Sequence, residues 1–164
     1  MSETASIREK HDGELDDRGS VRLWLRLLTC TTVIEKRIKR RFADRYDITL
    51  PRFDVMAALD RHPEGMTMGQ LSQALLVSNG NVTGVVQVLV RDRYVSLAPS
   101  PTDGRASVAR LTQLGRECFA GLAEAHHEWI EAMLAGLDRD QRSQLHDLLG
   151  ALKDSLAADD GGKE

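Results

Sequence analysis

Residues 71–85 read LSQALLVSNGNVTGV, and this run has the pattern of two short helices joined by a tight turn. Two helices that cross closely need apolar residues at the crossing, with a small residue just after the first of them. Ser72 supplies the small residue, and Leu76 stands at the turn position that often holds glycine. The crossing positions hold Leu71, Leu75, Val77, Val82 and Val85. This pattern predicts a helix-turn-helix.

The second helix of this pair, from Asn79 or Gly80 to Asp92, opens with short polar side chains. Such side chains let the start of a helix approach DNA closely, with its amide groups and dipole facing phosphate. Three residues offer amide and hydroxyl groups to base edges, namely Asn81, Thr83 and Gln87. Four others are expected to hold phosphates, namely Arg52, Thr67, Ser78 and Asn79. The alternative is an ordinary helical hairpin with Ser and Asn caps.

Outward from this run, the apolar spacing predicts further helices and one hairpin. A long helix begins near Ser20, and Pro51 suits the first turn of the next helix, which ends before His62. Two short strands, 95–97 and 108–111, flank a loop at 98–104 that contains two prolines and a glycine.

Thr112 is placed to cap another long helix, and Asp138 with Gln141 three positions later resembles a capping box before the last one. An apolar stripe follows on that last helix, at Leu145, Leu148, Leu149, Leu152 and Leu156. The fold expected is therefore mainly α, with a small β-hairpin.

The hairpin carries a recognisable signature. The wing of the MarR family is similar to a run of this sequence that starts with Asp103-Gly104-Arg105, continues after five residues with Leu111-Thr112, and ends at Gly115. The resemblance extends over residues 20–156, including Leu50-Pro51-Arg52-Phe53. It implies a winged helix-turn-helix homodimer joined by its first and last helices, with the second helix of the pair in the major groove of a near-palindromic operator. The resemblance also implies that Arg105 reaches the minor groove and that the Asp103 carboxylate holds the Arg105 side chain in place. The alternative is that Asp103 and Arg105 form a local ion pair that only stabilises the turn. Arg93 stands where relatives commonly have glycine, and Gly104 replaces an arginine common in the family's wings.

Together these observations predict five segments along the chain. They are a disordered arm at 1–19, an N-terminal dimerisation helix at 20–50, a winged helix-turn-helix lobe at 51–112, C-terminal dimerisation helices at 113–156 and a disordered tail at 157–164.

Charge is distributed unevenly along the chain. The net charge is −3, yet residues 21–52 hold nine basic and three acidic side chains, and residues 117–164 hold four basic and eleven acidic ones. Such asymmetry orients an anionic polymer to one face, although solvated helix faces are an equally good explanation.

No apolar run approaches the roughly 18–20 residues of a membrane span, and the polar start lacks a signal peptide. With only Cys30 and Cys118, we expect a cytoplasmic protein without a disulfide framework.

The resemblance implies a small-molecule effector in a cleft between the dimerisation helices and the DNA-binding lobe. Five residues could line an apolar pocket there or could simply form core, namely Trp24, Leu28, Phe42, Phe53 and Met56. The basic run at 36–41 is either a solvated helix face or an anion clamp, built from Lys36, Arg37, Lys39, Arg40 and Arg41. The phrases at 50–55 and 80–84 resemble a branch that senses aromatic-acid coenzyme A thioesters such as hydroxycinnamoyl-CoA. We therefore hypothesise a repressor that an effector of that class releases from DNA.

Other function classes have weaker support in the sequence. Oxidation of Cys30 would make a redox sensor, although its neighbours Leu27 and Leu28 favour a buried, inert thiol. His126 and His127 are adjacent and lack the one-turn spacing of a zinc site, so we expect no metal and no other cofactor. No phosphate loop or nucleophile elbow indicates an enzyme. A helical adaptor that does not bind DNA remains as an alternative.

Overall fold

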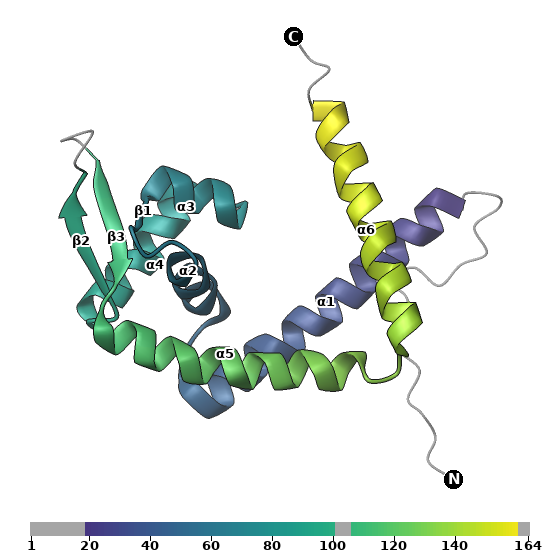
Figure 1. Ribbon diagram of the computed structural model, residues 1–164, viewed down its shortest axis with the longest axis horizontal. Helices are drawn as coiled ribbons and strands as arrows, with labels where there is room; N and C mark the ends of the chain where they lie inside the picture. The colour runs from purple at the N-terminus through teal and green to yellow at the C-terminus, as the bar shows by residue number, and fades with distance from the viewer. Residues whose placement is uncertain (1–18, 101–105, 161–164) are drawn as a thin grey trace. The chain divides into compact units, whose positions relative to one another are not determined.

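A computed structural model describes residues 19–100 and 106–160 of the 164-residue chain. Residues 1–18 of the arm predicted at 1–19, the wing residues Asp103 and Arg105, and residues 161–164 of the tail predicted at 157–164 lie outside the described residues. The chain forms two compact units, Met1–His126 and His127–Glu164. The elements run in the order α1 (Gly19–Tyr46), α2 (Leu50–Asp60), β1 (Met66–Thr67), α3 (Met68–Leu75), α4 (Asn79–Arg91), β2 (Val95–Pro99), β3 (Ser107–Leu111), α5 (Gln113–Leu134) and α6 (Arg139–Asp160) (Figure 1).

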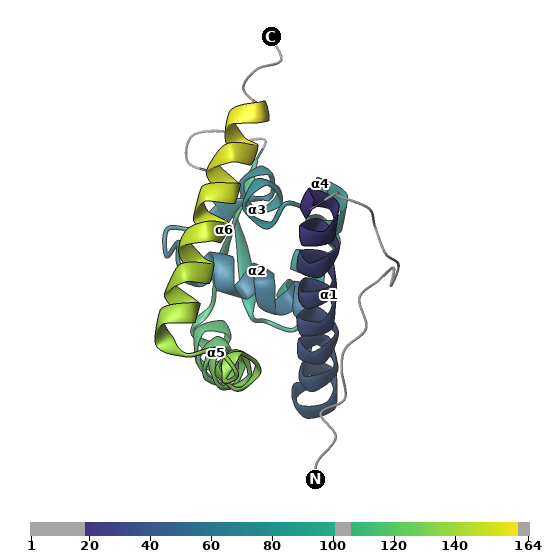
Figure 2. The same ribbon diagram turned by 90° about the vertical axis from the view of Figure 1, so that its right-hand side faces the viewer.

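Helix α1 is one unbroken helix of 28 residues (Figure 2). It buries only Leu25, Ile38 and Phe42, so most of its length is exposed in the single chain. Asp47 ends it in the left-handed conformation, with φ of 49°, which aspartate tolerates better than most residues. Pro51 then lies in the first turn of α2, as the sequence predicts, and α2 buries one side against the rest of the first unit.

A small antiparallel sheet closes the lobe, with strand order β1-β3-β2. Val95 pairs with Leu111 at one end of the hairpin, and Pro99 pairs with Ser107 at the other. The prediction that the loop begins at residue 98 was wrong, because β2 continues to Pro99. Since β2 is an edge strand, the missing amide hydrogen of Pro99 costs no ladder bond. Strand β1, which the sequence analysis missed, pairs Met66 with Ala109.

The helix-turn-helix prediction is confirmed by α3, α4 and the turn between them. Thr67 and Gln70 form a reciprocal capping box at the start of α3, with N···O distances of 3.2 and 2.8 Å. Leu76 ends α3 in the left-handed conformation, with φ of 54° and ψ of 40°. The Ser72 hydroxyl then donates to the Val77 carbonyl at 2.6 Å and closes the turn.

None of the described helices is by itself long and apolar enough to cross a membrane. Among the helices that the structure describes, α3 and α4 reach that length and hydropathy when taken together, and they are bent by 112° at their joint.

A network of backbone contacts fixes the end of α4 to the start of α5. Arg93 adopts φ of 63°, so it takes the left-handed conformation at the position where the sequence analysis noted glycine in relatives. Its carbonyl accepts a hydrogen bond of 2.8 Å from the Thr112 hydroxyl, whose oxygen caps α5 by accepting from the Gly115 amide at 2.9 Å. The Thr112 amide donates to the Tyr94 carbonyl at 3.0 Å. The predicted cap is therefore confirmed, and it also anchors the turn before β2.

The second unit contains the end of α5 and helix α6. Asp138 and Gln141 exchange hydrogen bonds of 2.9 and 3.0 Å, which confirms the predicted capping box. Arg142 spans the turn, because its guanidinium donates to the Glu131 carboxylate at 2.7 Å and to the Leu134 carbonyl at 3.0 Å. The helix continues to Asp160, past residue 156 where the sequence analysis expected it to end. All five leucines of the predicted stripe are exposed in the single chain.

Candidate functional site

Helix α4 has two chemically different sides. Val82, Val86 and Leu89 are almost fully buried and fix the helix against the lobe. The polar residues selected from the sequence are all exposed, namely Ser78, Asn79, Asn81, Thr83 and Gln87. Packing of the apolar row therefore leaves the polar row facing outward over the first turns of the helix.

Capping interactions define which groups remain available on this polar side. The Ser78 hydroxyl oxygen accepts a hydrogen bond of 3.4 Å from the Asn81 amide, which leaves the Ser78 hydroxyl hydrogen free to donate. The Thr83 hydroxyl donates to the Asn79 carbonyl at 2.9 Å, so the Thr83 oxygen can still accept. Helix α4 has 13 residues, and the positive end of its dipole coincides with these groups. This arrangement suits a negatively charged ligand approaching the start of α4.

Two of the expected phosphate-binding residues already have structural roles. Arg52 is partly buried, and its guanidinium lies 3.7 Å from the carboxylate of Asp92 at the end of α4. Arg91 approaches the same carboxylate at 3.1 Å. Thr67 caps α3 with both its hydroxyl and its amide. Arg52 thus ties α2 to the end of α4, and a phosphate would have to compete with Asp92 for it.

The predicted effector residues do not come together in one pocket. Phe42 and Met56 are fully buried and Phe53 is 6% exposed, so these three form core, as the alternative interpretation held. Phe53 packs 4.7 Å from both Phe42 and His126, measured between ring centroids. Leu28 is partly buried, whereas Trp24 is 58% exposed in the single chain.

Four cations of the basic run are exposed on α1, namely Lys36, Arg37, Lys39 and Arg40. Lys39 lies 2.5 Å from Glu35, and Arg40 lies 3.4 Å from Asp44, each one helical turn away. Exposed pairs of this kind contribute only about 0.3–0.5 kcal/mol each. Two of the four cations are therefore held only weakly by acidic neighbours.

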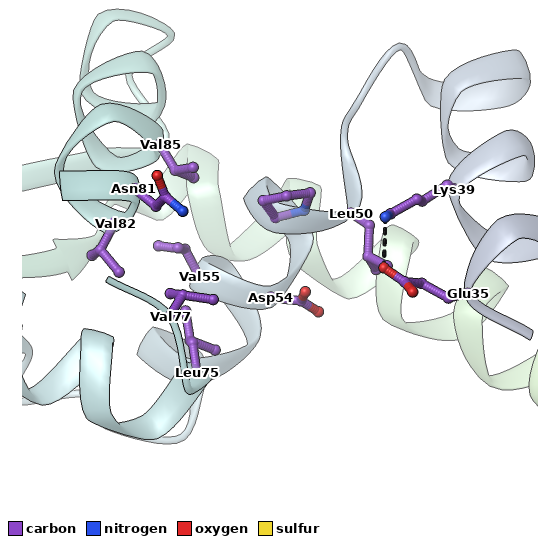
Figure 3. Close-up of a pocket in the computed structure, with 11 residues that line it drawn as sticks. Glu35, Lys39, Leu50, Asp54, Val55, Leu75, Val77, Asn81, Val82 and Val85 are labelled. Atoms are coloured by element: carbon purple, nitrogen blue, oxygen red, sulfur yellow. Dashed lines mark ion pairs between the residues drawn. The ribbon is translucent and has the colours of Figure 1, made fainter. Parts of the chain in front are cut away.

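A cavity of about 370 Å³ lies beside the start of α4 (Figure 3). Of the effector residues predicted from the sequence, only Lys39 lines it. Eleven residues of α1, α2, α3, α4 and the turn before α4 surround the cavity, namely Glu35, Lys39, Leu50, Pro51, Asp54, Val55, Leu75, Val77, Asn81, Val82 and Val85. Burial is the main cause that raises the pKa of Asp54 to about 6, and the nearby charge of Glu35 adds to the effect while Lys39 opposes it. Asp54 was not among the site residues predicted from the sequence, since a single acid in an amphipathic helix gives no signal of a cavity.

The two cysteines differ in exposure, and the prediction that Cys30 is buried was wrong. Cys30 is exposed in the single chain, because α1 packs through few residues and turns this position outward, whereas the sequence favoured a buried thiol. Cys118 is partly buried, and its thiol beside the Tyr94 hydroxyl raises the pKa of that phenol. Within residues 19–100 and 106–160, no three His, Cys, Asp or Glu side chains are grouped so that they could hold a metal ion.

Comparison with known proteins identifies the family. A sequence model of the MarR family matches residues 46–106. The transcriptional activatory protein BadR of Rhodopseudomonas palustris is 30% identical over 144 residues, which cover 85% of this chain and 82% of BadR.

Two solved structures share the fold. A crystal structure of a MarR family transcriptional regulator from Silicibacter pomeroyi is 32% identical and matches with a TM-score of 0.72, over 84% of this chain and 94% of the other. A mutant MarR from E. coli, crystallised with operator DNA, matches with the same TM-score at 22% identity, over 84% of this chain and 99% of that one. These relatives are transcriptional regulators and not enzymes, in agreement with the sequence analysis. The chain therefore belongs to the MarR family of transcriptional regulators.

Proposed function

We propose that this protein is a homodimeric regulator that reads a near-palindromic operator through α4 and releases it when a small aromatic effector binds. The observation that carries the proposal is the exposed polar row on α4, positioned by the buried row of Val82, Val86 and Leu89. The operator complex of the E. coli relative supports DNA as the ligand of this fold. The exposed leucines of α6 support a dimer, since a second copy would remove them from water.

Within α4, we assign the base contacts to Asn81, Thr83 and Gln87, whose side chains are exposed. Asparagine and glutamine pair with adenine through two hydrogen bonds, which contribute about 1–3 kcal/mol of discrimination against other bases. Phosphate contacts fall to Ser78 and Asn79, and to Arg52 and Thr67 after rearrangement of their present partners. We also retain Arg105 as the minor-groove contact of the wing, with Asp103 beside it.

The test of DNA binding is fluorescence anisotropy with duplexes from upstream of the protein's own gene and of its neighbours, at several salt concentrations. We expect tight, salt-dependent binding, weakened by Arg105→Ala. Asn81→Ala should relax the choice between operator variants, while Gln144→Ala, an exposed amide on α6, should leave it unchanged. The assignment would be contradicted if the protein bound none of the duplexes at low salt, or if Arg105→Ala kept full operator affinity.

For the effector, we propose an aromatic acyl-CoA thioester such as hydroxycinnamoyl-CoA. Its phosphate-rich tail suits the exposed cations Lys36, Arg37, Lys39 and Arg40 on α1, and its aromatic head would suit an apolar site near Trp24 and Leu28. Titration with p-coumaroyl-CoA in a gel-shift assay should release the operator, and a double variant, Lys36→Ala with Arg37→Ala, should need more ligand. No release at saturating ligand would reject this effector class.

A redox response is the second candidate, and one observation favours it. Cys30 is exposed in the single chain, so an oxidant can reach its thiol. Mild peroxide should then abolish operator binding in the wild type and leave it intact in Cys30→Ser. Equal sensitivity of the two proteins would remove this alternative.

A further inference from the structure

The cavity beside α4 has the size and walls of a ligand site. Its volume of about 370 Å³ lies within the range of about 300–1,000 Å³ that is common for small-molecule pockets. One wall is apolar and comes from α2, α3, α4 and the turn before α4, namely Leu50, Pro51, Val55, Leu75, Val77, Val82 and Val85. All of these residues belong to the first compact unit.

The opposite side of the cavity is charged. Glu35 and Lys39 of α1 form an ion pair there, at 2.5 Å (Figure 3). Figure 3 also shows the Asp54 carboxylate between this pair on one side and Val55, Val77 and Leu75 on the other. Asp54 is partly buried, and across the described part of the chain its carboxylate has neither a hydrogen-bond nor an ion-pair partner.

The charge of Asp54 is thus poorly compensated. Glu35 repels it, and Lys39, which attracts it, is already paired with Glu35. Burial raises the pKa of Asp54 to about 6, so the carboxylate is nevertheless ionised near neutral pH. A partly desolvated carboxylate without a partner gains strongly from a cation that reaches it, because the cation replaces lost hydration.

We propose that this cavity binds a small molecule with an apolar body and a protonated amine, whose ammonium pairs with the carboxylate of Asp54. The apolar body would pack against the valines of the opposite wall, such as Val77 and Val85. An anionic ligand would meet two carboxylates against a single lysine, so it is disfavoured. The site is consequently different in chemistry from the anionic effector proposed above, and ligand binding to it requires no DNA.

The same cavity touches the helix proposed to read the operator. Asn81 lines the cavity and is also one of the assigned base-contacting residues. A ligand in the cavity would therefore bias the position of the first turn of α4. This coupling rests on the proposed function, whereas the ligand binding does not.

The test compares three ligands that share an apolar body and differ in charge: phenethylamine, phenethyl alcohol and phenylacetate. Isothermal titration calorimetry at about pH 7.5 should show binding of the amine, at least about tenfold tighter than of the alcohol or the acid. Asp54→Asn should weaken amine binding about tenfold or more. The matched control is Asp60→Asn, which removes an exposed carboxylate from the same helix outside the cavity and should have no effect.

Two further arms keep the test decisive if Asp54→Asn folds poorly. Amine affinity should fall as the pH is lowered through about 6, because protonated Asp54 carries no charge; the charged groups that face it are Glu35 and Lys39 of α1. Glu35→Gln should also weaken binding of the amine, since the substitution frees the Lys39 ammonium to pair with the Asp54 carboxylate. Equal binding of the three ligands, no binding of the amine, or an amine affinity independent of both acids would overturn the proposal.

Operator binding separates the site from its coupling to DNA. Phenethylamine at a concentration that half-saturates the wild type should change operator affinity in the wild type and much less in Asp54→Asn, whose site is then mostly empty. If calorimetry detects the amine and operator affinity stays constant, the coupling is overturned and the site stands. If no duplex binds with or without amine, the DNA-binding proposal fails independently of the calorimetric result.

Discussion

Replacing Asp54 by asparagine should stabilise this protein near neutral pH in the absence of any ligand. The substitution keeps the size of the side chain and removes its charge. Asp54 is partly buried on α2, and burial, followed by the charge of Glu35, raises its pKa from 3.8 to about 6. The folded state therefore disfavours the ionised carboxylate more than the unfolded state does.

The magnitude follows from the difference between the two pKa values. Two pKa units correspond to an upper limit of about 3 kcal/mol, since each unit is worth about 1.4 kcal/mol. Because Asp54 keeps some contact with solvent, we reduce this to about 1–2 kcal/mol. The sign follows from linkage: as the pH rises from about 4 to about 6, the unfolded chain ionises first, so the wild type loses this stability and the loss is complete above about pH 6.

Thermal and urea denaturation of both proteins, followed by circular dichroism from about pH 4 to about pH 8, measures the effect. At about pH 7.5 we expect Asp54→Asn to be more stable by about 1–2 kcal/mol, with the difference vanishing near pH 4. Asp60→Asn, on the exposed end of the same helix, should change stability by less than about 0.5 kcal/mol at any of these pH values. A stability difference that is independent of pH, or a less stable Asp54→Asn at neutral pH, would refute the assignment of a desolvated carboxylate.

Three further substitutions test the turns and caps by thermal denaturation. The Leu76→Gly protein should be more stable than the Leu76→Ala protein by about 0.5–1 kcal/mol. Leu76 is left-handed at φ of 54° and 91% exposed, so glycine relieves backbone strain without loss of packing. A glycine variant less stable than the alanine variant would contradict this. Gly115→Ala should destabilise the folded protein by at least about 2 kcal/mol, because the added Cβ would lie 2.0 Å from the Tyr94 carbonyl oxygen. The control is Gly121→Ala on the same helix, whose added Cβ meets open space, so it should not destabilise the protein. Asp138→Ala should cost about 1 kcal/mol through loss of the cap on α6, and an unchanged melting temperature would show that the cap is dispensable.

Features with short sequence separation were predicted correctly. The cap of α6 joins residues three positions apart, and Ser72 stands, as predicted, at the small position of the helix-turn-helix. Leu76 and Arg93 were both noted as non-glycine residues where glycine is common, and both adopt positive φ. These features depend on residues only a few positions apart, so the sequence alone contains the groups that form them.

Features that depend on distant segments were missed or misplaced. Strand β1 is only two residues long, too short for a period, and exists because Met66 meets Ala109 across the sheet. Apolar spacing on α1 suggested a buried Cys30, whereas few positions of that helix find partners in the single chain. Trp24 and Phe42 have the same chemical character in the sequence, yet one is 58% exposed and the other fully buried.

The amino-acid sequence by itself thus determined the order of the helices, the helix-turn-helix, the caps and the polar row on α4, because local hydrogen bonds and the 3.6-residue period encode them. Only the tertiary structure decided which apolar residues are core and where a cavity remains. The cavity is built from four helices and a turn, and the Asp54 carboxylate is partly buried beside Glu35 and Lys39 only in the folded chain. Burial depends on which residues are neighbours in the folded structure, and local sequence patterns do not specify residues that are distant along the chain.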